Sequence, residues 1–228
     1  LWMTQNHSYS MIGMGDQLAI CYPEKKLTFS CMADNQGNPA ARKLIFQLVQ
    51  TEIVDQLADH AIEADPAARE NLAMKNMSLV LAPCPGATGS PLADQINGRV
   101  YLLADNPMGI TEFSLHFYGN KGSFTYKNAQ GDKQISFGLG YYEAGLFPQT
   151  GYPDENYLPS DALYECLASA AWPENDQLVL RIMTVGNFYG NLTITFHFTN
   201  RQVEVDMVRN AQFFLNEYQG HAVGQIAL

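Results

Sequence analysis

The sequence contains no run of about 18 apolar residues, the length that a membrane-spanning helix needs. Its first residues also lack the basic segment, the apolar stretch and the small-residue cleavage site of a signal peptide. We therefore expect a soluble protein with no membrane partner. Basic residues are few, since 13 Lys and Arg stand against 23 Asp and Glu and give a formal net charge of −10. This charge opposes binding to phosphate backbones, so nucleic acid is not an expected partner.

The four cysteines are widely separated and form no C-x-x-C pair; they are Cys21, Cys31, Cys84 and Cys166. No histidine stands at metal-ligand spacing from any of them, so we expect neither a zinc site nor a redox dithiol, and no cofactor. Free cysteine is among the most buried residue types. The pattern therefore predicts buried, reduced thiols, which favours the cytoplasm.

Two strands are predicted near the start of the chain, over residues 17–23 and 27–33, joined by the short polar turn PEKK. Leu18, Ile20 and Tyr22 alternate with residues that are scarcely more polar. Because neither side of this hairpin looks fully solvated, we expect its sheet to be covered on both faces.

Two helices are predicted next. An apolar stripe indicates a helix over residues 39–59, with Asn38 as its cap and a proline in its first turn. The same arrangement recurs in a shorter helix near 66–75, capped by Asp65. The first helix can cover one face of the preceding sheet.

A stretch rich in Pro, Gly and Ser, PCPGATGSP over residues 83–91, indicates a boundary between two domains, 1–82 and 83–228. Beyond it the apolar pattern alternates with a period of two. Eight segments are predicted strands: 96–104, 111–119, 123–129, 133–140, 165–172, 177–185, 191–199 and 202–208. The fold class is thus α+β: antiparallel strands with a packed helix, followed by an antiparallel lipocalin-like β-barrel or a two-sheet sandwich.

Two further segments of the second domain stand out. Residues 211–220, AQFFLNEYQG, predict a short helix that could plug one end of the barrel through Phe213, Phe214 and Tyr218. Residues 138–159 form a long loop rich in aromatic residues, Gly and Pro. Such loops often shape binding sites, so we expect this one to meet a ligand or a partner.

The opening segment carries a turn at Gly13, Met14, Gly15 and Asp16, the triplet Pro-Glu-Lys at residues 23–25 and a helix that begins with Asn-Pro. This order resembles the end of a serine hydrolase of the beta-lactamase and penicillin-binding-protein type. Residues 96–109, 135–140, 168–172 and 211–220 also resemble a C-terminal extension of some bacterial members of that group. The two resemblances together cover most of the chain.

The family's S-x-x-K nucleophile motif is missing, because none of the ten Ser residues has Lys three positions later. No K-T-G or H-x-G triplet precedes the turn, and Asp16 stands where the family has a second glycine. The resemblance implies an amide or ester hydrolase that acts through an acyl-serine, with no catalytic residue in this chain. In the intact parent, Gly13, Met14, Gly15 and Asp16 would line the substrate site.

The chain opens on Leu1 and reads as a strand almost at once, so we expect a piece of a longer protein whose partner is the missing N-terminal catalytic part. A sheet edge near residues 8–15 would then be uncovered and could form a homo-oligomer. Two alternatives to the hydrolase remain open. One is a lipocalin-like barrel that binds a small ligand, and the other is a protein-interaction module.

Overall fold

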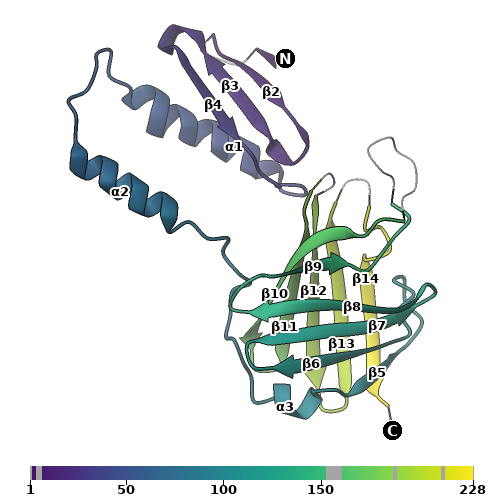
Figure 1. The fold of residues 1–228 in the computed structure, drawn as a ribbon. Coiled ribbons are helices and arrows are strands. Elements are labelled where there is room, and N and C mark those ends of the chain that lie inside the picture. Colours follow the sequence, from purple (N-terminus) through teal and green to yellow (C-terminus); the bar gives the residue numbers. More distant parts are fainter. Residues whose placement is uncertain (1, 4–6, 153–160, 187–188, 212–213, 228) are drawn as a thin grey trace. The chain divides into compact units, whose positions relative to one another are not determined.

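The computed structural model describes residues 2–3, 7–152, 161–186, 189–211 and 214–227 (Figure 1). The chain divides into two compact units, residues 1–80 and 81–228. None of the helices in this described part of the chain combines the length and the apolar character needed to cross a membrane.

The first unit holds a four-stranded antiparallel sheet in the order β1-β2-β3-β4. Its strands are β1 (Trp2–Met3), β2 (Tyr9–Ile12), β3 (Leu18–Tyr22) and β4 (Leu27–Cys31). Its helical segments are two 3-10 turns (Met14–Asp16 and Pro23–Lys25), α1 (Pro39–Leu48), a π-helix (Val49–Ile53), a further 3-10 turn (Val54–Gln56) and α2 (Pro66–Met77). Because β1 pairs with Tyr9 and Ser10, β2 is an inner strand, and the edge expected near residues 8–15 is partly covered.

A small core joins this sheet to the α1 segment. Leu18, Ile20 and Tyr22 alternate along β3, point to one face and pack against Val49 and Val54. The helical path beyond α1 therefore covers that face, as the apolar stripe predicted. The other face is not covered as expected, since Thr28, Ser30 and Met11 on it are exposed.

The two predicted helix caps have different outcomes. Asp65 accepts a hydrogen bond from the Ala68 N–H at 2.9 Å, which confirms it as the cap of α2. The Asn38 side chain makes no capping hydrogen bond, so that prediction is wrong. The Asn38 backbone carbonyl instead accepts from the Ala41 N–H at 3.2 Å.

The second unit is a barrel that begins with the short helix α3 (Ala93–Ile96), and its neighbouring strands pair antiparallel except for β8 and β10, which pair in parallel. Its strands are β5 (Val100–Leu103), β6 (Glu112–Tyr118), β7 (Lys121–Asn128), β8 (Gly131–Leu139), β9 (Glu143–Phe147), β10 (Tyr164–Glu174), β11 (Gln177–Thr184), β12 (Gly190–Thr199), β13 (Gln202–Asn210) and β14 (Gly220–Ile226). The β14–β5 and β10–β11 pairings close the ring, and β9 is an extra strand paired with β10. The barrel alternative of the predicted fold class is thus confirmed.

All eight predicted strands of this unit are present, and β9 and β14 were missed. The helix predicted over 211–220 is wrong, because its described residues form turns and β14 begins at Gly220. The inward-pointing residues of β14 are small, since Ala222 and Gly224 lie opposite larger neighbours. The strand therefore lacks the strong apolar alternation that revealed the other strands.

The Pro- and Gly-rich stretch over residues 83–91 is bonded to the barrel. The Cys84 N–H donates to Ser169 Oγ at 3.1 Å, and Ala87 and Trp172 exchange two backbone hydrogen bonds of 2.9 Å. Ser90 Oγ donates to the Asn175 carbonyl at 2.5 Å. This stretch, which we call the strap, thus extends the edge of β10 and belongs to the barrel.

Candidate functional site

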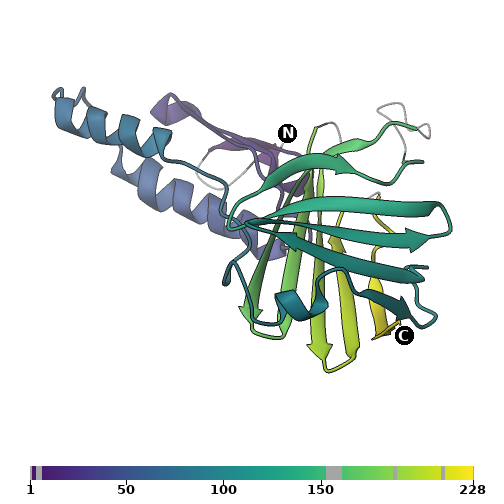
Figure 2. The ribbon, with the colours of Figure 1, turned by 60° about the horizontal axis from the view of Figure 1, so that its bottom comes forward.

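The inside of the barrel is the candidate site, and much of it is filled by side chains of the strands themselves. In Figures 1 and 2, β6, β7 and β8 cross in front of β11, β12 and β13, so that two walls face each other. Leu178, Leu180, Leu192, Ile194 and Phe196 on the rear wall have 0% exposure. Because any internal void that admits water would expose the atoms lining it, these side chains border no such void.

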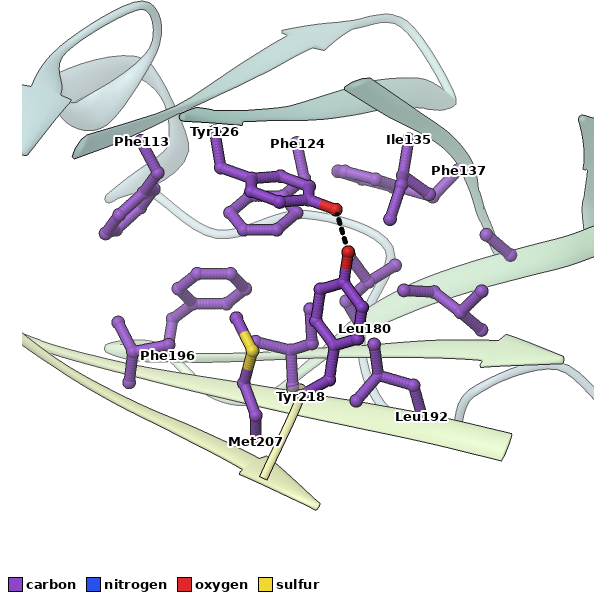
Figure 3. Packing of buried hydrophobic residues seen from close by; sticks show 14 of the residues in the cluster. Phe113, Phe124, Tyr126, Ile135, Phe137, Leu180, Leu192, Phe196, Met207 and Tyr218 are labelled. Carbon is purple, nitrogen blue, oxygen red and sulfur yellow. Dashed lines mark hydrogen bonds between the residues drawn. The ribbon is translucent and has the colours of Figure 1, made fainter. Parts of the chain in front are cut away.

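Aromatic rings of the opposite walls meet directly around Phe196. Its ring centroid lies 5.3 Å from that of Phe113 and 5.4 Å from that of Phe124 (Figure 3). These separations are typical of packed aromatic pairs. This part of the interior is therefore filled by side chains.

A chain of polar groups crosses the rest of the interior. The hydroxyl oxygens of Tyr126 and Tyr218 are 2.6 Å apart (Figure 3), and Tyr218 also donates to Gln149 Oε1 at 3.1 Å. Since a tyrosine has one hydroxyl proton and that of Tyr218 goes to Gln149, Tyr126 is the donor to Tyr218. All three side chains are buried.

A second polar pair lies close to this chain. The Tyr152 hydroxyl donates to Glu217 Oε1 at 2.6 Å. Burial raises the pKa of Tyr126, Tyr152 and Tyr218, so all three phenols are protonated at neutral pH and can donate hydrogen bonds. The neighbouring Glu217 carboxylate raises the pKa of Tyr152 further.

Several buried side chains near this polar chain come from connections between strands. Phe214, Leu215 and Tyr218 belong to the β13–β14 connection and are at most 3% exposed, while Gln149 and Tyr152 follow β9. The plug predicted through Phe214 and Tyr218 is thus confirmed in a non-helical form, and Phe213 lies outside the described residues. Gln149 and Tyr152 fall in the long loop over 138–159 that we expected to shape a site.

Among the described residues, two buried polar atoms in the barrel interior have no hydrogen-bond partner, the Tyr101 hydroxyl and the Trp172 Nε1. Both rings lie beside Phe198, with centroid separations of 5.7 Å for Tyr101 and 6.4 Å for Trp172. An unmade hydrogen bond at a buried group destabilises a fold by about 1–3 kcal/mol. Sequence reasoning missed both groups, since nothing local marks an unpaired donor.

The four residues predicted to line a substrate site lie in the first unit, at the turn between β2 and β3. Asp16 is buried there, and Arg42 of α1 donates from Nε to its carboxylate at 2.6 Å. The Gly15 carbonyl accepts from the Asn35 N–H at 3.0 Å. Gly13 and Met14 complete the turn. The geometry gives Asp16 a structural role, because its carboxylate joins the turn to the helix.

In the described residues, no group of three or more His, Cys, Asp or Glu side chains is placed to hold a metal ion. The four cysteines are free. Cys84 and Cys166 are buried, and burial raises the pKa of the Cys166 thiol to about 11. Cys21 and Cys31 are only half-buried, so the prediction that all four are buried is wrong for these two.

No protein-family model and no curated protein matches the chain. Solved structures do match it. The brain fatty-acid-binding protein of Drosophila melanogaster has 12% identity over 58% of this chain and 99% of its own, with a TM-score of 0.37. The REP1-NXSQ fatty acid transporter has 8% identity over 60% and 98%, with a TM-score of 0.40. Human cRBP IV has 12% identity over 56% and 96%, with a TM-score of 0.34.

None of these proteins is a beta-lactamase or a penicillin-binding protein, and no match points to such a hydrolase. The interpretation of the chain as the end of a bacterial serine hydrolase with an accessory domain is therefore wrong. Its basis was a local order of Gly and Pro turns between strands, and any short antiparallel hairpin can carry such turns.

The Tyr126–Tyr218 contact can be measured by a double-mutant cycle. Tyr218→Phe leaves the Tyr126 hydroxyl buried and unpaired, so we expect a loss of about 1–3 kcal/mol in the free energy of unfolding. Adding Tyr126→Phe removes the orphaned group, and the double variant should be less destabilised than the two single losses added together. Chemical denaturation checks this, with the half-exposed Tyr118→Phe as control. Strict additivity would contradict the contact.

Proposed function

We propose that the barrel binds a small, largely apolar molecule with one hydrogen-bonding group. The proposal is based on where the side chains that contact or surround Tyr126 are attached to the backbone. Phe214, Leu215 and Tyr218 reach the interior from a connection, so they can leave it without breaking the strand ladder of the wall. A ligand would take their place, which makes binding and displacement of the plug one event.

The ligand is small because the half of the interior around Phe196 is filled by wall side chains. Its polar group would replace the Tyr218 hydroxyl opposite Tyr126. Tyr126 is protonated and donates, so it would bind an acceptor such as a hydroxyl or a carbonyl oxygen. The free thiols fit a reducing compartment, and we propose the cytoplasm.

The test uses two probes of nearly the same shape, p-cresol and toluene, which differ in one hydroxyl group. NMR titration of the full chain should show saturable shifts with p-cresol at residues around Tyr126 and Tyr218. Tyr218→Ala removes a side chain that has the same shape as p-cresol. This variant should therefore bind p-cresol at least about tenfold more tightly than the wild-type chain does. Tyr126→Phe should remove the preference for p-cresol over toluene.

Val223→Ala is the matched control, because Val223 is 40% exposed on β14 and makes no part of this site. It should leave every titration unchanged. Failure of the wild-type chain to give a saturable shift with either probe up to about 10 mM would overturn the proposal.

A further inference from the structure

The sheet of the first unit ends at β4, whose second edge faces no other strand among the described residues. The ladder shows which groups this edge presents. The Gly13 N–H donates to the Gln17 carbonyl at 2.8 Å, so Gln17 and every second residue after it bond towards β2. Leu18, Ile20 and Tyr22 then bond towards β4 and its residues 27, 29 and 31. The N–H and C=O groups of Thr28 and Ser30 therefore point outward.

Nothing in the described residues occupies these four backbone groups. Thr28 and Ser30 are exposed, and the strand reads LTFSC, with no charge, no proline and no bulge. Protein sheets usually protect an exposed edge by one of those devices, because an open edge pairs readily with another strand. The edge of β4 is therefore competent to accept a strand.

We propose that β4 pairs with β4 of a second copy of this chain, antiparallel about a two-fold axis at Phe29. In that register Thr28 of each copy lies opposite Ser30 of the other. Their outward N–H and C=O groups then form four backbone hydrogen bonds across the axis, two for each Thr–Ser pair. The two sheets become one continuous sheet.

The side chains suit this register on both faces. On the core face, Phe29 meets itself at the axis and Leu27 lies opposite Cys31 of the other copy. These three side chains are half-buried at the border of the core of the first unit, and pairing would bury them further. On the other face, Thr28 lies beside Ser30 of the other copy, a favourable cross-strand combination.

The charges at the two ends of the strand favour antiparallel pairing. Lys26 directly precedes β4, whereas the neighbouring Lys25 is paired with Asp59 at 3.3 Å, and Asp34 follows the strand. Antiparallel strands bring unlike ends together, whereas parallel strands would bring like ends together. The net charge of −10 on each copy opposes association, so the dimer should form at high protein concentration.

Sedimentation equilibrium of the full chain tests this from about 5 µM to about 500 µM at physiological salt. We expect a monomer at the low end and a dimer at the high end. Ser30→Pro removes one outward N–H from each copy, hence two of the four hydrogen bonds, and leaves the β3–β4 ladder intact. Dimerisation should weaken at least about tenfold. Ser30→Ala keeps the N–H and is the matched control.

Hydrogen exchange of the wild-type chain gives a readout that needs no variant. The Thr28 and Ser30 amides should exchange fast at low concentration and become protected at high concentration, while the Phe29 amide is protected throughout. A monomer at about 500 µM overturns the proposal. So does a dimer that leaves the Thr28 and Ser30 amides unprotected, since its interface must lie elsewhere.

Discussion

Replacing Phe196 by alanine is expected to lower the free energy of unfolding of the barrel by about 3–5 kcal/mol. The ring has 0% exposure and lies where the two walls meet, against Phe113 and Phe124. Its loss removes contacts with both walls at once. The neighbouring side chains are themselves held by the strand ladders, so the cavity can collapse only in part.

Trp172 should report this transition, because it is buried in the barrel and unfolding would expose its ring to water, which should change its fluorescence. The other tryptophan, Trp2, belongs to the first unit, so the measurement uses a Trp2→Phe background. Val208→Ala is the control, since Val208 is 51% exposed and its truncation should matter by less than about 0.5 kcal/mol. A loss below about 1 kcal/mol for Phe196→Ala would mean that the walls do not pack on each other.

Gly86→Ala is expected to detach the strap from β10 and to destabilise the barrel by about 2–4 kcal/mol. Gly86 has φ +141°, a conformation that L-residues rarely adopt. A Cβ there would lie 2.8 Å from the carbonyl carbon of Trp172 and 2.9 Å from the nitrogen of Pro173. Because these are backbone atoms of a paired strand, the strap must move rather than β10.

Hydrogen exchange at the Ala87 and Trp172 amides measures the detachment directly, since each donates to the other's carbonyl in the native barrel. Both should lose protection in Gly86→Ala. The matched control is Gly89→Ala, three residues further along the strap, where an added Cβ meets nothing within 4 Å. Equal exchange in the two variants would show that the strap is not held at Gly86.

The strands with the cleanest alternation were the most predictable elements. In β12, Leu192, Ile194 and Phe196 point inward between threonines, so the period of two is visible in any window of the sequence. β14 could not be found in that way, because Ala222 and Gly224 are too small to mark an inward face. β14 can pair at this place because Gly224 has no side chain that would collide with those of Leu103 and Val203. Such complementarity of size is visible only once the strands are paired.

The candidate site was predictable only in part. An aromatic cluster after the last predicted strand indicated a plug and identified Phe214 and Tyr218. The partner of Tyr218 is Tyr126, 92 residues earlier in the chain, and no spacing rule connects the two. The hydrolase interpretation also relied on local pattern alone. It assigned a substrate site from a turn between two strands, although this chain contains no S-x-x-K nucleophile to complete that site.

Periodicity was thus enough to predict a set of paired strands that form either a barrel or a two-sheet sandwich, since alternation of apolar and polar side chains sets which side of each strand avoids water. The closing of the ring through β14 and β5, the pairing of the strap with β10 and the Tyr126–Tyr218 contact were decided by the tertiary structure. Each joins segments far apart in the chain. Which of many possible partners a strand or a hydroxyl meets depends on the packing of everything between them, and that packing leaves no mark in a short stretch of sequence.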